Sequence, residues 1–181
     1  MKNLFVILLT FISLTAFSQA KLTTTSGHIK FFSSTPAEDI EANNYKVISN
    51  LTTDKGDLVF SVPMQSFEFE KALMQKHYNS SKFLDTKKFP KSKFKGTITN
   101  MAEIDLNTDG SYEAHVTGSL TIHGVTKEIK ENLQLKVNGG KVTGTTSFDI
   151  VLADYGVVFA KGKPSTNIAK TVKATVNLDF K

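Results

Sequence analysis

The side chains of this 181-residue chain that could carry chemistry are mainly its four histidines, because the chain contains no cysteine. His123 is the most suggestive, since it precedes Gly124 at the corner of an alternating stretch, GSLTIHGVTKEI at residues 118–129. Catalysis there would need a nucleophile or base and an orienting acid at one spot, and the sequence offers no such set. The glycine supplies the permissive backbone that a tight turn needs. We therefore expect His123 to shape the turn or to contact a ligand's head group, and we expect no catalytic residues.

The other histidines show no metal-ligand spacing. No His-x-x-x-His or His-Glu-x-x-His pattern occurs, so neither a metal site nor a cofactor is expected. His115 alternates with the polar side of its strand and should face water. His77 follows Phe69 and Leu73 at intervals of four residues, which leaves two interpretations open. It is a core histidine bonded to a backbone carbonyl, or a polar contact in the mouth of a cavity.

Residues suited to an apolar core or cavity are more numerous than residues suited to catalysis. Fourteen phenylalanines and no tryptophan give large apolar area without a polar tip, which suits either a packed core or a lipid cavity. The net charge of +5 comes from dispersed lysines, so nucleic acid is a poor fit as a partner. Lysines in 87–88, 91–95 and 161–163 admit two interpretations, either solvated charge or a ring around an anionic head group.

The first twenty residues, MKNLFVILLTFISLTAFSQA, have one lysine, an apolar run from Leu4 to Phe17, and then small and polar residues. This order is typical of a secretory signal peptide, and the run is short for a stable membrane span. We expect a signal peptide at residues 1–20, cleaved after Ser18 or Ala20, and one domain at residues 21–181. The protein should then be periplasmic or secreted, and without disulfides it is held together by packing alone.

From residue 26 onward, apolar and polar residues alternate with a period of two. In one such stretch Leu58, Phe60 and Val62 share a face. Turn signals at 54–57, 107–111, 123–124 and 138–140 separate about eight runs, near 26–33, 45–53, 57–66, 93–105, 111–122, 126–137, 141–152 and 167–180. The predicted fold class is all-β, an antiparallel up-and-down β-barrel of about eight strands, and a two-sheet sandwich is the alternative.

One segment, residues 67–94, breaks this alternation. Its spacing of four places Met74 with Tyr78, and Leu73 with His77, which predicts an amphipathic helix of two to three turns. Pro90 bars its continuation toward the next strand. A short helix between the third and fourth strands would cap one end of the barrel or lie across an opening.

Two motifs resemble the YceI-like family. Residues 82–97, KFLDTKKFPKSKFKGT, match a phenylalanine-rich motif that precedes a strand, and residues 116–129, VTGSLTIHGVTKEI, match a hairpin motif. The resemblance extends over about residues 22–181. It implies an exported bacterial protein with a lipocalin-like barrel that binds a lipid or polyisoprenoid, and it implies no catalytic residues.

We therefore expect an exported, non-enzymatic protein that binds a long-chain lipid or isoprenoid in the barrel lumen. The predicted ligand-binding residues are inward-facing on strands or on the apolar side of the helix: Phe60, Val62, Met64, Phe69, Leu73, Met74, His77, Phe94, Ile98, Leu120, Ile122, Phe148 and Ile150.

Small residues at inward positions indicate that the lumen is not filled: Gly96, Ala114, Gly118, Gly144, Thr146 and Ala174. A solid core stays open as the alternative, with a structural or stress-related role in the cell envelope. A further alternative is an enzyme acting on a lipid-like substrate. The sequence does not decide between a monomer and a homodimer.

Overall fold

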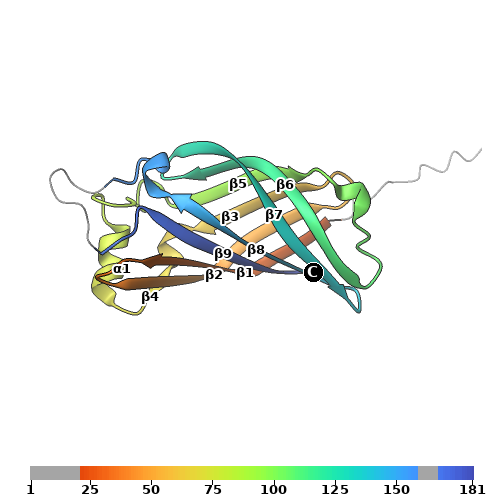
Figure 1. Cartoon of the computed structure of the whole chain (residues 1–181), viewed down its shortest axis with the longest axis horizontal. Helices are drawn as coiled ribbons and strands as arrows, with labels where there is room; N and C mark the ends of the chain where they lie inside the picture. The colour runs from red at the N-terminus through yellow and green to blue at the C-terminus, as the bar shows by residue number, and fades with distance from the viewer. Residues whose placement is uncertain (1–20, 159–166) are drawn as a thin grey trace, which may run out of the picture.

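The computed structural model describes residues 21–158 and 167–181, and across them the chain forms a closed antiparallel β-barrel (Figure 1). The predicted signal peptide, together with Lys161 and Lys163, lies outside these residues. The barrel strands are β1 (Lys21–Ser34), β2 (Asp39–Thr52), β3 (Asp57–Pro63), β5 (Lys91–Ile98), β6 (Gly110–Ile122), β7 (Val125–Asn138), β8 (Lys141–Val151) and β9 (Thr171–Phe180). These eight strands confirm the predicted barrel and exclude the sandwich.

The sheet closes through its first strand. Around the barrel the strands follow the order β1-β9-β8-β7-β6-β5-β3-β2, and β2 pairs again with β1. The ladder between β1 and β2 runs from Lys21 opposite Thr52 to Ser34 opposite Asp39. The two-residue β4 (Glu68–Phe69) adds a short pairing to β2 outside this order. Because every barrel strand has a partner on both sides, little unpaired edge is left.

Burial follows the alternation that the sequence predicts. In β9, for example, Val172, Ala174 and Val176 are buried, whereas Thr171 and Lys173, which alternate with them, are exposed. The one helix among the described residues, α1 (Ala72–Asn79), lies between β4 and β5, which is between the third and fourth barrel strands as expected. It has about two turns. Short 3₁₀ turns complete the elements: η1 (Met64–Ser66), η2 (Met101–Glu103) and η3 (Leu152–Tyr155).

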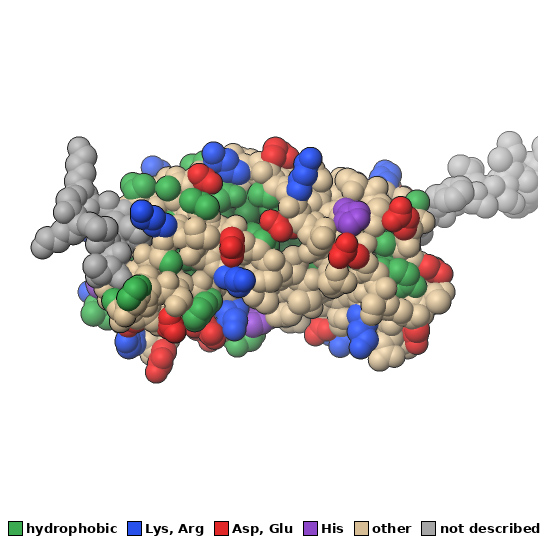
Figure 2. Space-filling view, viewed as in Figure 1, with side chains coloured by type: hydrophobic (Ala, Val, Ile, Leu, Met, Phe, Trp, Pro, Cys, Tyr) green, Lys and Arg blue, Asp and Glu red, His purple; other side chains and the backbone are tan. Residues whose placement is uncertain are grey.

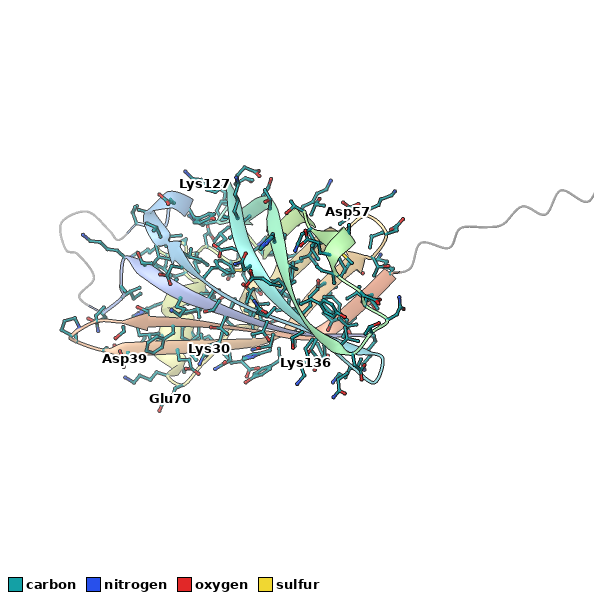
Figure 3. The ribbon with its side chains drawn as sticks, turned by 45° about the vertical axis from the view of Figure 1, so that its right-hand side comes forward. Lys30, Asp39, Asp57, Glu70, Lys127 and Lys136 are labelled. Atoms are coloured by element: carbon teal, nitrogen blue, oxygen red, sulfur yellow. The ribbon has the colours of Figure 1, made fainter. Side chains whose placement is uncertain are left out.

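The elongated barrel has two different ends. In Figure 1, α1 and β4 lie at one end. In Figure 3, Asp39 and Glu70 mark that same end, and Asp57 marks the opposite one. No helix in residues 21–158 or 167–181 is long and apolar enough to cross a membrane.

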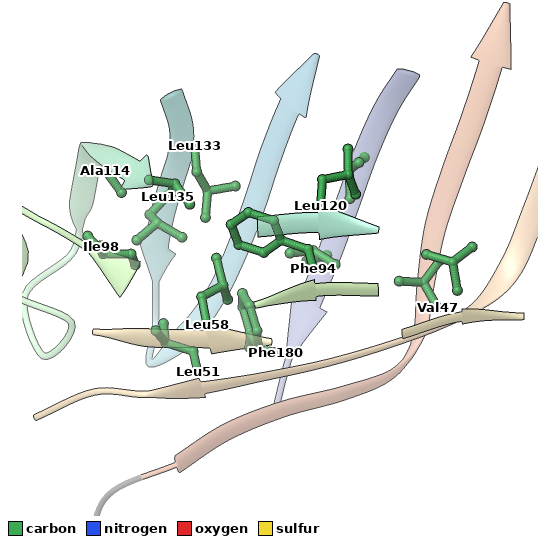
Figure 4. Packing of buried hydrophobic residues seen from close by; sticks show 14 of the residues in the cluster. Val47, Leu51, Leu58, Phe94, Ile98, Ala114, Leu120, Leu133, Leu135 and Phe180 are labelled. Atoms are coloured by element: carbon green, nitrogen blue, oxygen red, sulfur yellow. The ribbon is translucent and has the colours of Figure 1, made fainter. Parts of the chain in front are cut away.

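The end opposite α1 is filled by side chains. Leu51, Leu58, Ile98, Leu133 and Leu135 are each no more than 2% exposed and converge from four strands, β2, β3, β5 and β7 (Figure 4). Burial of one such side chain contributes about 1.5–3 kcal/mol to folding. This packed end supplies a rigid floor for the rest of the barrel.

Two glycines let a phenylalanine ring complete this packing. Gly96 on β5 lies directly opposite Gly118 on β6. A Cβ atom at Gly96 would lie 2.5 Å from the Phe94 ring and 2.9 Å from the Cα of Gly118. The space left by the two missing side chains is therefore occupied by Phe94, and these glycines do not leave the lumen empty.

We expect Gly96→Ala to lower the free energy of unfolding by about 1–3 kcal/mol, because the added methyl group overpacks this contact. The neighbouring Lys95 is exposed on the outer face, so Lys95→Ala should change stability by no more than about 0.5 kcal/mol. Urea unfolding of both variants measures the difference. Equal stabilities would contradict the packing of Phe94 over the two glycines.

Candidate ligand-binding cavity

The half of the barrel that carries α1 is hollow. It contains a cavity of about 600 Å³, within the range of small-molecule sites. Side chains from all eight barrel strands line it, and the segment from Met64 to Leu84 covers one side. Leu58 and Leu133 lie at its floor, since both line the cavity and belong to the packed core. The lining is predominantly apolar, so the cavity suits an apolar ligand.

Most of the predicted ligand-binding residues meet in this cavity. The following line it: Phe60, Val62, Met64, Phe69, Met74, His77, Phe94, Leu120, Ile122, Phe148 and Ile150. Whether they bind a ligand stays a prediction, but their placement agrees with it.

Two predicted residues lie elsewhere. Ile98 is buried in the packed end, beneath the floor, because β5 continues past the hollow half. Leu73 is 63% exposed and does not line the cavity. The prediction for Leu73 depends on a helical spacing that starts at Phe69, but Phe69 belongs to β4 and the helix begins only at Ala72. The face of α1 toward the barrel therefore carries Met74 and Tyr78, and the prediction for Leu73 is wrong.

Small inward residues account for the cavity only in part. Thr146 and Ala174 line it, whereas Ala114 is fully buried in the packed core. A Cβ atom at Gly144 would lie 3.2 Å from Leu133, so that position is also packed. Small inward residues alone therefore do not explain the hollow half.

An aromatic cluster forms the covered wall. The Tyr78 ring is surrounded by four phenylalanines with ring centroids 5.0–6.5 Å away, namely Phe31, Phe67, Phe69 and Phe83. Phe31 and Phe67 were not among the predicted ligand-binding residues, although the alternation of Ile29, Phe31 and Ser33 could have indicated the first. Burial raises the pKa of the Tyr78 phenol, so this ring stays uncharged.

Weakly partnered hydroxyl groups sit beside this cluster. The Tyr78 hydroxyl lies 4.0 Å from the Met64 sulfur, and the Ser92 hydroxyl donates to the same sulfur at 3.0 Å. A thioether is a weak acceptor. Both hydroxyls lie in residues that line the cavity.

Polar contacts connect the segments at the α1 end of the cavity, around Glu38, Lys71 and His77, which we call the mouth. Lys71, which precedes α1, forms an ion pair with Glu38 at 2.6 Å, and the Asn167 side chain donates to the same carboxylate at 3.1 Å. These hydrogen bonds, that from Lys71 first, lower the pKa of the Glu38 carboxyl. The exposed side chains of His77 and Lys82 also line the cavity here. His77 is therefore a rim residue, and the alternative of a buried core histidine is wrong.

The lysines predicted as a ring are mostly apart from the cavity. Lys93 contributes to the lining, whereas Lys87, Lys88, Lys91 and Lys95 are exposed and do not. For these four, the interpretation as solvated charge fits the structure.

The wall of the hollow half has a gap between β7 and β8. Their ladder ends at Gln134 opposite Thr145, although β7 extends to Val125 and β8 to Val151. One contact follows the ladder, since the Thr146 hydroxyl donates to the Asn132 carbonyl oxygen at 2.7 Å. We call the stretch between residues 125–133 and 146–151 the β7–β8 window. Its inward side chains, including Ile129 and Phe148, are only half-buried. Figure 2 shows hydrophobic side chains at the surface between these two strands.

His123 closes the far side of this window. Its φ of 51° and the φ of 79° at Gly124 form the corner between β6 and β7. Its Nδ1 donates to the carbonyl oxygen of Tyr155 in η3 at 3.3 Å. Its ring meets Phe89 edge-on, with centroids 4.5 Å apart. The interpretation of His123 as a turn residue is confirmed.

An acidic side chain faces the window. Glu131 occupies an inward position of β7, directly opposite the buried Val116 of β6, and it lines the cavity. Desolvation, with a smaller contribution from Asp149, raises the pKa of its carboxyl. Within the described residues its carboxyl has no hydrogen-bond or ion-pair partner. The sequence signal was available, because Glu131 interrupts an alternating apolar series between Ile129 and Leu133.

In residues 21–158 and 167–181, no three His, Cys, Asp or Glu side chains gather in a way that could hold a metal ion. His115 is exposed as predicted, and its Nδ1 donates to the side chain of Asn132 at 3.0 Å.

Comparison with known proteins supports the fold. A sequence profile described as the YceI-like domain matches residues 10–181. A polyisoprenoid-binding domain from Saccharophagus degradans, implicated in plant cell wall breakdown, superposes with a TM-score of 0.75 at 14% identity, over 91% of this chain and 99% of that one. BcnA from Burkholderia cenocepacia gives a TM-score of 0.69 at 18% identity, over 84% and 95% of the two chains.

Sequence relatives carry less information. A protein of Pseudomonas fluorescens described as a UPF0312 protein is 34% identical over 101 residues, which cover 51% of this chain and 49% of the relative. A protein of Pseudomonas putida with the same description is 44% identical over 54 residues, 30% of this chain and 24% of the relative. The chain thus matches about half or less of the length of these relatives.

The two sides of α1 yield a matched test. We expect Met74→Asp to weaken binding of the neutral apolar dye 1-N-phenylnaphthylamine by about tenfold or more, because it places a charge in the apolar lining. Leu73→Asp should leave dye binding unchanged and stability within about 0.5 kcal/mol, because Leu73 is exposed in the first turn, where an acidic residue is tolerated. Dye titration and thermal unfolding of both variants check this. Equal losses would contradict the observed orientation of the helix.

Proposed function

The chain belongs to the YceI-like family, and on that basis we propose that it is an exported, non-enzymatic carrier of one long apolar chain, isoprenoid or fatty acyl, held in the hollow half of its barrel. The observation that carries this proposal is the apolar cavity of about 600 Å³ above a fully packed floor. A solid-core structural role would leave that volume without a purpose.

The energetics favour a chain-shaped ligand. Removal of each methylene from water contributes about 0.8 kcal/mol, and the cavity offers aromatic and aliphatic surface from almost every barrel strand. Aromatic side chains such as those around Tyr78 provide large contact area at low cost in side-chain entropy. The Saccharophagus degradans domain with the same fold is described as polyisoprenoid-binding, which is consistent with a chain of this kind.

Export is the second part of the proposal. It rests on the lysine and the apolar run at the N-terminus, which have the order of a signal peptide. The mature protein should then begin at Gln19 or Lys21 and lie in the periplasm or outside the cell. The absence of cysteine is compatible with such a location, because a barrel whose first and last strands are paired can be stable without disulfide bonds.

Native mass spectrometry of protein purified from the periplasm of its own host tests both parts. We expect a mass that begins at Gln19 or Lys21, plus a single bound lipid that organic extraction removes. Ala174→Phe should abolish or strongly reduce that lipid, since Ala174 lines the cavity between Phe31 and Phe148 on the adjacent strands. The matched control Lys173→Phe places the same ring on the outer face of β9 and should retain the lipid.

Repeated absence of lipid from the unmodified protein would contradict the carrier function. Equal lipid in the Ala174→Phe variant would show that the ligand lies elsewhere. A protein that still carries residues 1–20 would contradict export while leaving the binding proposal intact.

A further inference from the structure

The carboxyl of Glu131 is out of place in a cavity that holds only hydrocarbon. It extends from the inward side of β7, between Ile129 and Leu133 along the strand and opposite Val116 on β6, and all three neighbours are apolar and line the cavity. None of the described residues forms a hydrogen bond or an ion pair with it. A half-buried carboxyl without a protein partner keeps only part of its hydration, so a ligand atom can supply the hydrogen bond that the protein does not.

The neighbouring charges make this place negative. Asp149 on β8 acts on Glu131 across the window and raises its pKa, after the larger effect of desolvation. Lys127 shares the inward side of β7 but is exposed toward the hairpin tip, and Figure 3 shows it at the edge of the molecule. Lys130, the adjacent residue, occupies an outer-face position on β7 and is exposed. On β9, Lys173 lies opposite Asp149 and is exposed on the outer face. When the Glu131 carboxyl is ionised, a ligand group beside it therefore meets a negative charge that forms no ion pair with a cation of the described residues.

This charge selects by chemistry. A carboxylate accepts hydrogen bonds from a hydroxyl, phenol or amide N–H, and it repels a carboxylate or phosphate, most strongly where water is partly excluded.

We propose that Glu131 makes the cavity specific for an uncharged chain ending in a hydrogen-bond donor, such as a long-chain alcohol, phenol or amide, and excludes fatty acids and prenyl phosphates. This inference rests on the proposed carrier function and adds to it the class of the ligand's head group. The head group lies at the β7–β8 window, beside Glu131.

The mouth provides the competing place for a head group. Lys82 and Lys93 contribute to the cavity lining and carry the charge that an anionic head would need. The affinity for an anionic head group bound there would not depend on the charge of Glu131. The two placements therefore predict opposite responses to removal of the Glu131 charge.

A pair of fluorescent probes that differ only in the head group decides between them. cis-Parinaric acid and its alcohol share one C18 chain, so the contribution of the chain to affinity cancels in their ratio. At pH 8 we expect the unmodified protein to bind the alcohol about tenfold or more tighter than the acid. Glu131→Gln keeps the shape and removes the charge, and it should bring the two dissociation constants to within about threefold, mainly through tighter binding of the acid.

Glu128→Gln is the matched control, because Glu128 is exposed on the same strand and hydrogen-bonded to Ser119. This variant should keep the preference of the unmodified protein. An equal or tighter affinity of the unmodified protein for the acid would overturn the inference, and so would a preference that Glu131→Gln leaves unchanged. If Glu131→Gln fails to fold, Glu131→Ala removes the same charge and should abolish the preference in the same way. Failure of both probes to bind any of the three proteins would instead contradict the carrier function itself.

Discussion

Closure of a single sheet through β1 is the constraint on which the rest of the structure depends. β1 pairs with β2 along nearly its whole length and with β9 from His28 to Phe32, so the first and last strands meet at one seam. An eight-stranded barrel has an interior just wide enough for side chains or for one small ligand. Here the two possibilities are divided along the axis, because large side chains fill one end and the other stays hollow. Burial of apolar side chains at the packed end stabilises the fold, and the hollow end leaves room for a ligand.

The two motifs of the YceI-like resemblance meet in space at the hollow end. Phe89, from the first motif, packs against His123 of the hairpin motif, and a Cβ atom at Gly124 would lie 2.6 Å from the same ring. His123 in turn holds η3 through the Tyr155 carbonyl. This chain of contacts joins the covering segment, the β6–β7 corner and the end of β8. It bounds the window at its far side, so a residue type associated with catalysis serves here to position the wall of a cavity.

The strands, their number and the position of the helix could be predicted from the sequence, because inward and outward residues alternate wherever a strand has one dry face. The side of the helix that faces the barrel could not be predicted. The spacing of four residues starts at Phe69, and Phe69 lies in the short strand β4 and not in the helix. Ile98 was misplaced because alternation tells which side a residue faces but not how deep along the barrel it lies. The alternation does not reveal the window, since β7 and β8 keep it beyond the point where their ladder ends. The one sequence sign of the window is Glu131, an acidic residue in an apolar series.

We propose that one apolar chain occupies the hollow half of the barrel and leaves the packed half undisturbed. Electron density from crystals of protein purified without removal of lipid tests this most directly. We predict continuous, elongated density between the Tyr78 cluster and the β7–β8 window, with none beneath Leu58 and Leu133. Density for ordered water alone in that volume, or a cavity closed by inward movement of α1 and β8, would contradict the account.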